Sequence, residues 1–222
     1  MGFNLDPINF IGIMLGIIIG ATVHEFMHAY TAVMLGDNTP RRDGRITLNP
    51  VAHFDPFGFL LFVLMALGVG FFAMAKPVMI NPGALRNGRI GGVMVALAGP
   101  LSNLVLGAVF ALPFRLGLTD NLPDPAVQIL SSVMWINFVL FVFNLIPLPP
   151  LDGSHVLEGL FSPRWSLLMQ PLRRYGYMPI LVLILLPTVL GSTLGGARID
   201  VIGRIIGPVL TLLSSVFAGT PS

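Results

Sequence analysis

The stretch that decides the fold is the long apolar run PINFIGIMLGIIIGATVHEFMHAYTAVML, residues 7–35. It is longer than the roughly 20 residues that a helix needs to cross a membrane. Its second half nevertheless contains His24, Glu25 and His28. A charged group at mid-membrane costs roughly 2.5–3.5 kcal/mol on insertion scales. The sequence therefore predicts an interaction that offsets this cost.

The composition is that of an integral membrane protein. Of its 222 residues, 55% are hydrophobic and only 10% are charged, whereas a soluble domain has about 25% charged residues. The absence of cysteine excludes disulfides, iron–sulfur clusters and thiol catalysis. The twelve Lys and Arg are scattered through loops without a basic stripe, which argues against nucleic-acid binding. No basic residue precedes the first apolar run, so a cleaved signal peptide is not expected.

Further apolar segments indicate an all-α polytopic membrane protein, built as a helical bundle with short β or turn segments. Residues 45–48 follow a turn signal and have short-strand character. Residues 1–222 are expected to form one membrane domain, with its core at about 8–160 and accessory helices at about 165–219. Further spans are expected at about 90–112, 127–146 and 178–194, and 199–219 is either a span or an interfacial helix.

The spacing of His24, Glu25 and His28 is that of a metal site. In a helix, His24 and His28 are i and i+4, so both imidazoles project from one face. Glu25 can reach a water on a metal held by the two histidines, as a general base would. Two alternatives are core histidines bonded to backbone carbonyls and a proton-relay pair in a transporter. The complete H-E-x-x-H spacing favours the metal.

A catalytic zinc usually takes a third protein ligand. In NLIPLPPLDGSHVLEGL, residues 144–160, the prolines end a helix and Asp152 and Gly153 turn into a new one. The Asp152 carboxylate then either points inward to the metal or serves as an N-cap, and the spacing is compatible with both. The candidates for the third ligand are His53, Asp55, Asp152, His155 and Glu158.

These motifs together resemble the site-2 protease family of intramembrane zinc metalloproteases. The resemblance covers roughly residues 8–160 and combines H-E-x-x-H, A-G-P-x-x-N ending at Asn103, and Asn144 eight residues before the Asp152 of L-D-G. The chain resembles the short bacterial branch, which lacks PDZ and CBS domains.

The resemblance implies a role for each matching residue. It makes His24, His28 and Asp152 the ligands of Zn²⁺ and Glu25 the catalytic base. Asn144 would hold the substrate backbone or the developing oxyanion. Asn103 either supports a ligand by a hydrogen bond or joins two helices. His53 is expected to be a loop histidine or a substrate contact rather than a further ligand.

A shared metal also constrains the topology. His28 and Asp152 can meet only if their two spans run in the same direction. Residues 57–75 must then be re-entrant rather than spanning, with Gly68 and Gly70 near the bend. Residues 36–89, which carry six Lys and Arg, would lie on one side. The positive-inside rule makes this side cytoplasmic and places the re-entrant segment and the site there.

The expected function is hydrolysis of peptide bonds in or near transmembrane segments. The resemblance implies single-span, membrane-anchored substrates in the bacterial cytoplasmic membrane, and the partners are these substrates and the lipid bilayer. Residues 45–48 could pair with an unwound substrate. A CAAX-processing metalloprotease would instead take Glu158 as its third ligand. A metal or proton transporter would use the same histidines without needing Glu25 as a base.

Overall fold

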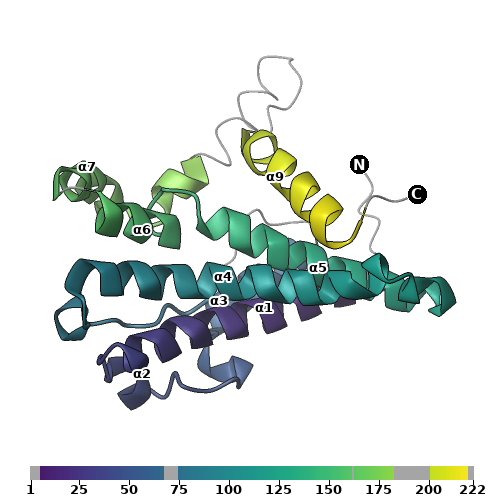
Figure 1. Ribbon diagram of the computed structural model, residues 1–222, viewed down its shortest axis with the longest axis horizontal. Helices are drawn as coiled ribbons and strands as arrows, with labels where there is room; N and C mark the ends of the chain where they lie inside the picture. Colours follow the sequence, from purple (N-terminus) through teal and green to yellow (C-terminus); the bar gives the residue numbers. More distant parts are fainter. Residues whose placement is uncertain (1–5, 68–74, 162, 183–200, 220–222) are drawn as a thin grey trace.

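Three long helices form the body of the protein in the computed structural model, which describes residues 6–67, 75–161, 163–182 and 201–219. They are α1 (Pro7–Met34), α4 (Gly88–Arg115) and α5 (Asp124–Asn144). The three run side by side, and each contacts the other two (Figure 1). All three are long and apolar enough to cross a membrane. The predicted all-α polytopic fold is confirmed.

Shorter elements connect and flank these helices. The helix α9 (Val201–Phe217) lies above α5 in Figure 1 and packs against it, with the rings of Phe138 and Phe217 5.8 Å apart. Most of the span expected at 178–194 lies outside the described residues. The shorter elements are α2 (Thr39–Arg42), η1 (Pro50–Ala52), α3 (Pro56–Ala66), η2 (Pro82–Ala84), η3 (Leu118–Asn121), α6 (Asp152–Leu160), α7 (Pro163–Arg174) and α9 (Val201–Phe217).

The packing of α1 against α5 depends on glycines. A Cβ atom at Gly12 would lie 2.7 Å from the Ser132 side chain. A Cβ atom at Gly16 would lie 2.9 Å from the Ile136 side chain. Small residues spaced in this way let two membrane helices approach closely. The close approach brings the face of α1 that carries the histidines against α5 and α4.

The direction of the helices brings the distant motifs together. Helices α1 and α5 end at the same end of the bundle, where α4 begins (Figure 1). Helix α6 follows α5 at that end, so Asp152 at its start can reach the last turns of α1. The expected parallel course of the two spans is therefore confirmed.

The chain leaves the loop at His53, forms α3, and returns to the same place at Lys76. The backbone N–H of Lys76 donates to the His53 carbonyl at 2.9 Å. The buried Arg45 guanidinium donates to carbonyls at both ends of the segment, those of Ala52 (2.7 Å) and Pro77 (3.1 Å). Helix α3 has 11 residues, about 16 Å at 1.5 Å per residue, against a hydrocarbon core of about 30 Å. This geometry agrees with a re-entrant segment, whose expected bend at Gly68 and Gly70 lies outside the described residues.

A buried carboxylate ties the two loops of this region together. Asp37 is 1% exposed, and its side chain accepts hydrogen bonds from the backbone N–H groups of Thr39 (2.9 Å) and Asn81 (2.6 Å). Burial by itself raises the pKa of the Asp37 carboxyl, but these hydrogen bonds and the charge of Arg42 lower it below its usual value. Asp37 therefore holds residues 76–81 beside the end of α1 as an ionised group.

The short strand expected at residues 45–48 is wrong. The part of the chain that the structure describes contains no strand, and residues 46–47 form a bend. Their polar groups are used locally: the Thr47 carbonyl accepts from His53 Nε2 at 2.8 Å, and Thr47 Oγ1 accepts from the Asn49 N–H at 3.1 Å. A strand needs a ladder of hydrogen bonds to a neighbour, and side-chain contacts replace that ladder here.

Candidate metal centre

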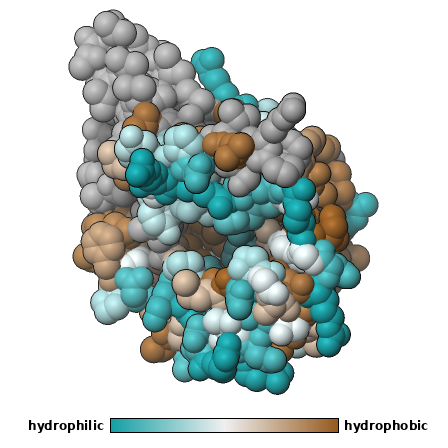
Figure 2. Space-filling model, turned by 90° about the vertical axis from the view of Figure 1, so that its left-hand side faces the viewer, coloured by the Kyte–Doolittle hydropathy of each residue, from teal (hydrophilic) through white to brown (hydrophobic). Residues whose placement is uncertain are grey.

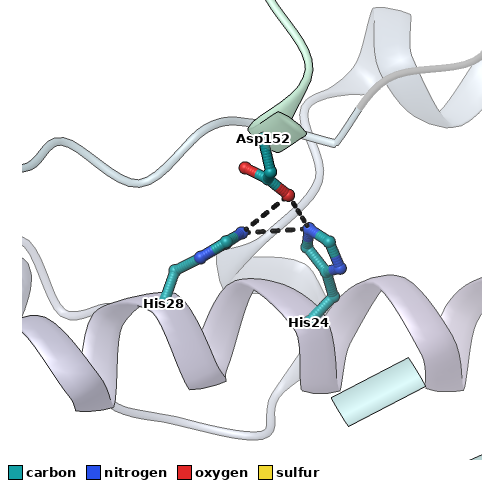
Figure 3. Close-up of side chains that lie close together, drawn as sticks. All are labelled: His24, His28 and Asp152. Carbon is teal, nitrogen blue, oxygen red and sulfur yellow. Dashed lines mark hydrogen bonds and ion pairs between the residues drawn. The ribbon is translucent and has the colours of Figure 1, made fainter. Parts of the chain in front are cut away.

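Two imidazoles of α1 converge on one point beside α4. His24 Nε2 and His28 Nε2 lie 3.0 Å apart, and both residues are buried (Figure 3). The Nδ1 atoms of both rings face hydrogen-bond acceptors on α4. His24 Nδ1 is 2.6 Å from Asn103 Oδ1, and His28 Nδ1 is 2.7 Å from the Val95 carbonyl. Both Nδ1 atoms therefore carry the proton, and both Nε2 lone pairs point to the same place.

The Asp152 carboxylate completes this group from the start of α6. Asp152 Oδ2 is 3.1 Å from His24 Nε2 and 3.3 Å from His28 Nε2 (Figure 3). Leu151 is the N-cap of α6, and no side-chain hydrogen bond caps the helix. The N-cap alternative for Asp152 is therefore wrong, and its carboxylate faces the imidazoles instead.

Asp152 is ionised in this arrangement. Burial raises the pKa of its carboxyl, but the facing His28 and His24 side chains lower it further, and the net pKa is well below the usual value. Its Oδ2 is buried and has no conventional hydrogen-bond partner. With both imidazoles neutral, two lone pairs and a carboxylate oxygen converge on one point, and this donor set suits a metal cation.

The distances fit a metal such as zinc. With bonds of 2.0–2.1 Å, two ligand atoms of a tetrahedral zinc lie about 3.3 Å apart. The three separations here are 3.0, 3.1 and 3.3 Å. These are the three residues that could hold a metal ion among the described residues, and their ligand atoms all lie within 4.8 Å of one another. Three protein ligands leave a fourth position for water or substrate, as in catalytic zinc sites.

Two glycines make room for this arrangement. A Cβ atom at Gly99 would lie 2.4 Å from His28 Nε2 and 2.7 Å from His24 Nε2. A Cβ atom at Gly153 would lie 2.3 Å from the Leu145 carbonyl oxygen, so Gly153 lets α6 start directly beside the end of α5. These contacts explain why A-G-P-x-x-N and L-D-G each contain a glycine at this position.

The three residues open onto a cavity of about 840 Å³, whose lining is mainly apolar. Glu25 also lines this cavity and is 9% exposed, while it makes none of the three contacts among His24, His28 and Asp152. Glu25 therefore shares a cavity with the three candidate ligands, and its role as the base stays a prediction. Figure 2 shows this end of the molecule, where hydrophilic residues surround a hollow with hydrophobic residues inside it.

Of the other residues proposed for the site, two contribute to the cavity or the histidines and two lie outside the centre. Asn144 lines the cavity, and one of its amide N–H groups donates to the Leu140 carbonyl at 2.9 Å, which leaves its second N–H. Asn103 supports His24 as described above. His53 is fully buried under its own loop and does not line the cavity. Asp55 caps α3 by accepting from the Gly58 N–H at 2.8 Å, and it too is outside the centre.

A second polar group lies at the rim of the cavity. The Glu158 carboxylate pairs with Arg173 of α7, and His155 Nδ1 is 3.9 Å from Glu158 Oε2. Burial and the charge of Arg173 lower the pKa of His155, which is therefore neutral near pH 7. Glu158 thus forms an ion pair with Arg173 and is not one of the three converging ligands.

The structure adds residues to the cavity that the sequence did not single out. Arg89 and Tyr177 both line it. Arg89 donates to the Glu158 carbonyl at 2.6 Å and also to that of Phe161, and so caps the end of α6. Burial raises the pKa of the Tyr177 phenol, which stays protonated. Neither residue belongs to a recognisable short motif, so only their tertiary position identifies them.

Comparison with known proteins agrees with this geometry. The family model of peptidase family M50 matches residues 115–187, which include Asn144 and Asp152. The chain is 36% identical over 211 residues to the candidate zinc metalloprotease YwhC of Bacillus subtilis, covering 92% of each chain. It is 31% identical over 195 residues to the candidate zinc metalloprotease Rip2 of Mycolicibacterium smegmatis, covering 83% of this chain and 72% of Rip2. No solved structure matches the chain.

The similarity to YwhC extends over almost the whole of both chains, and it accompanies a His-His-Asp centre built from the same motifs that suggested the family. The protein therefore belongs to peptidase family M50, the site-2 protease family.

Proposed function

We propose that the protein hydrolyses peptide bonds in or near the transmembrane segments of membrane-anchored proteins, with Zn²⁺ held by His24, His28 and Asp152. The observation that carries this proposal is the convergence of two imidazole lone pairs and a carboxylate oxygen inside a helical membrane bundle. Next to them, Glu25 lines the same cavity without being one of the three ligands. Metalloproteases use such an arrangement for hydrolysis.

Each residue then has a distinct task. Zinc, when bound, supplies Lewis-acid polarisation of a carbonyl and makes water more acidic. Glu25 takes the proton of the attacking water and passes it to the leaving nitrogen. The second N–H of Asn144 donates to the substrate carbonyl as negative charge develops on its oxygen. The apolar cavity wall keeps bulk water away, which strengthens these electrostatic interactions.

The substrate must present an unwound backbone, because a helix hides its peptide groups. Residues 76–81 form no helix or strand, and residues 77–80 line the cavity. The backbone N–H and carbonyl groups of Val78, Met79 and Ile80 form no hydrogen bond in the described residues. These groups supply an edge on which an unwound, single-span substrate can pair. This segment replaces residues 45–48 as the proposed pairing edge, and crosslinking from position 79 tests it, as described in the Discussion.

The test is the zinc content of the detergent-purified protein beside that of Asp152→Ala. We expect about one zinc per chain in the wild type, as in other catalytic centres with three protein ligands, and little in the variant. Elemental analysis measures this without any knowledge of the substrate. As a matched control, Asp55→Ala removes an N-cap aspartate outside the centre and should lose about 1 kcal/mol of stability but no zinc.

Two results would change the proposal. Zinc retained in Asp152→Ala but lost in Glu158→Gln would favour the CAAX-processing type of centre. Absence of zinc from the wild type, together with ion flux that survives Glu25→Gln, would favour a transporter.

We further propose that the centre faces the cytoplasm of a bacterial cell. The segment that joins α1 to α4 carries five Lys and Arg, and Arg89 in the first turn of α4 adds a sixth, whereas the loop that follows Arg115 has none before α5. The positive-inside rule supports this orientation. Because the chain has no cysteine, single cysteines at the exposed positions Asp43 and Asp120 can be labelled in intact cells. Only the cysteine at Asp120 should react with an impermeant maleimide, and the reverse pattern would overturn the orientation.

A further inference from the structure

We propose that Asn137 of α5 is a positioning residue for the metal centre, acting through Asn103 on the tautomer of His24. This inference rests on the proposed function, since it assigns His24 as a metal ligand. Asn137 belongs to none of the motifs that suggested the family. It lies in the apolar stretch SSVMWINFVLF of α5, and it is completely buried.

A chain of hydrogen bonds runs from α5 to the metal centre. Asn137 Nδ2 donates to the Val133 carbonyl at 2.8 Å. Asn137 Oδ1 accepts from Asn103 Nδ2 at 3.1 Å. Asn103 Oδ1 accepts from His24 Nδ1 at 2.6 Å. Asn103, like Asn137, is completely buried, so water does not compete for these bonds.

The direction of every bond in this chain follows from its first member. A backbone carbonyl only accepts, so the amide nitrogen of Asn137 must face Val133 and its oxygen must face Asn103. The nitrogen of Asn103 must then face Asn137, and its oxygen must face His24. His24 Nδ1 must therefore carry the proton, and the lone pair on Nε2 is left for the metal.

A second hydrogen bond also holds Asn103 in this orientation. Its Nδ2 also donates to the Gly20 carbonyl at 3.0 Å. Asn137 is therefore one of two acceptors that orient Asn103, and its loss should weaken the constraint rather than abolish it. A Cβ atom at Gly20 would lie 2.8 Å from Asn137 Oδ1 and 3.3 Å from Asn103 Nδ2. The packing of α1 thus leaves room for this chain of hydrogen bonds.

Asn137→Leu tests the proposal because leucine keeps a similar volume and removes both hydrogen bonds. We expect zinc to bind about tenfold more weakly, at the lower end of the 10–100-fold range for losing a partner that orients a ligand. The measurement is the dissociation constant from competition with a chelator. Asn137→Asp should bind zinc nearly as tightly as the wild type, because a buried, protonated carboxyl can donate to Val133 and accept from Asn103.

The matched control is Thr22→Val on α1. Thr22 is 4% exposed and lies two residues before His24, and its hydroxyl has no hydrogen-bond partner among the described residues. Its replacement should leave zinc affinity unchanged. In the double variant Asn103→Leu, Asn137→Leu, the second change should cause no further loss, because Asn137 acts through Asn103. Additive losses, or unchanged affinity in Asn137→Leu, would overturn the proposal.

A second readout does not depend on zinc. The chain has four histidines, so ¹⁵N spectra of the metal-free, histidine-labelled protein can resolve the tautomer of His24. We expect the Nδ1–H form in the wild type and a mixture in Asn137→Leu. An unchanged tautomer would refute the role of Asn137 even if the affinity had fallen through a loss of stability. A wild type that has the predicted tautomer but binds no zinc would refute the proposed function and leave the positioning of His24 supported.

Discussion

Replacing Gly99 with alanine is expected to weaken zinc binding more than about 100-fold. The new methyl group would lie 2.4 Å from His28 Nε2 and 2.7 Å from His24 Nε2, where nonbonded atoms cannot remain. The helix α4 cannot simply move away, because its Val95 carbonyl holds His28 and its Asn103 holds His24. We expect an affinity loss above the 10–100-fold typical of a lost supporting hydrogen bond. Elemental analysis and chelator competition measure it.

Gly92→Ala is the matched control. Gly92 lies on the same helix and lines the same cavity, but a Cβ atom there would meet nothing within 4 Å. This change should retain zinc and stabilise the helix by up to about 1 kcal/mol. If Gly99→Ala folded and bound zinc as tightly as Gly92→Ala does, the assignment of His24 and His28 as ligands would be wrong.

Replacing Glu25 with glutamine is expected to stop cleavage while zinc stays bound. Glutamine has nearly the same shape but cannot take up a proton, and general acid–base catalysis typically contributes 10²–10⁴-fold to a rate. Glu25 is not one of the three converging ligands, so the metal affinity should change little. The measurement pairs zinc content with cleavage of a single-span substrate in detergent or liposomes.

Glu158→Gln is the control for charge in the same cavity. Glu158 lines it as well, but its carboxylate pairs with Arg173. This variant should keep both its zinc and most of its activity. Cleavage that survives Glu25→Gln at the wild-type rate would remove Glu25 from the mechanism.

The inactive Glu25→Gln protein also offers a way to trap the substrate. A photo-crosslinking residue at Met79, which is 64% exposed, should capture a substrate held along residues 76–81. The same probe at Leu116, which is 65% exposed beyond the far end of α4, should not. Equal crosslinking at the two positions would contradict the proposed pairing edge.

Much of the centre could be predicted from the sequence, because its ligands lie in local motifs. The two histidines are one helical turn apart, so any helix over residues 7–35 puts them on one face. Asp152 is harder to assign, since an aspartate at the start of a helix is equally an N-cap. The position of Leu151 as the N-cap decides between the two. The requirement of a common metal also predicted, from the direction of the spans, that residues 57–75 do not cross.

The short strand at residues 45–48 shows where local signals fail. β-branched residues after a turn favour a strand only if a neighbouring strand supplies the hydrogen bonds. Here the Thr47 carbonyl accepts a hydrogen bond from His53, and the Arg45 side chain donates to carbonyls 7 and 32 residues further along the chain. The proposed pairing edge is instead residues 76–81, which contain Pro77 and are followed by Pro82, and which lack strand-like alternation.

The sequence by itself determined the membrane class, the long helices and the H-E-x-x-H pair, because hydropathy and helical periodicity are local properties of the chain. Only the tertiary structure decided which aspartate faces the histidines, why Gly99 must lack a side chain, and that Asn137 reaches His24 through Asn103. Each of these depends on atoms from different helices that lie within about 3 Å of one another, a distance at which hydrogen bonds form and hard-sphere contacts begin. No pattern along the chain encodes such a distance, since it is set by how closely α1, α4 and α5 pack.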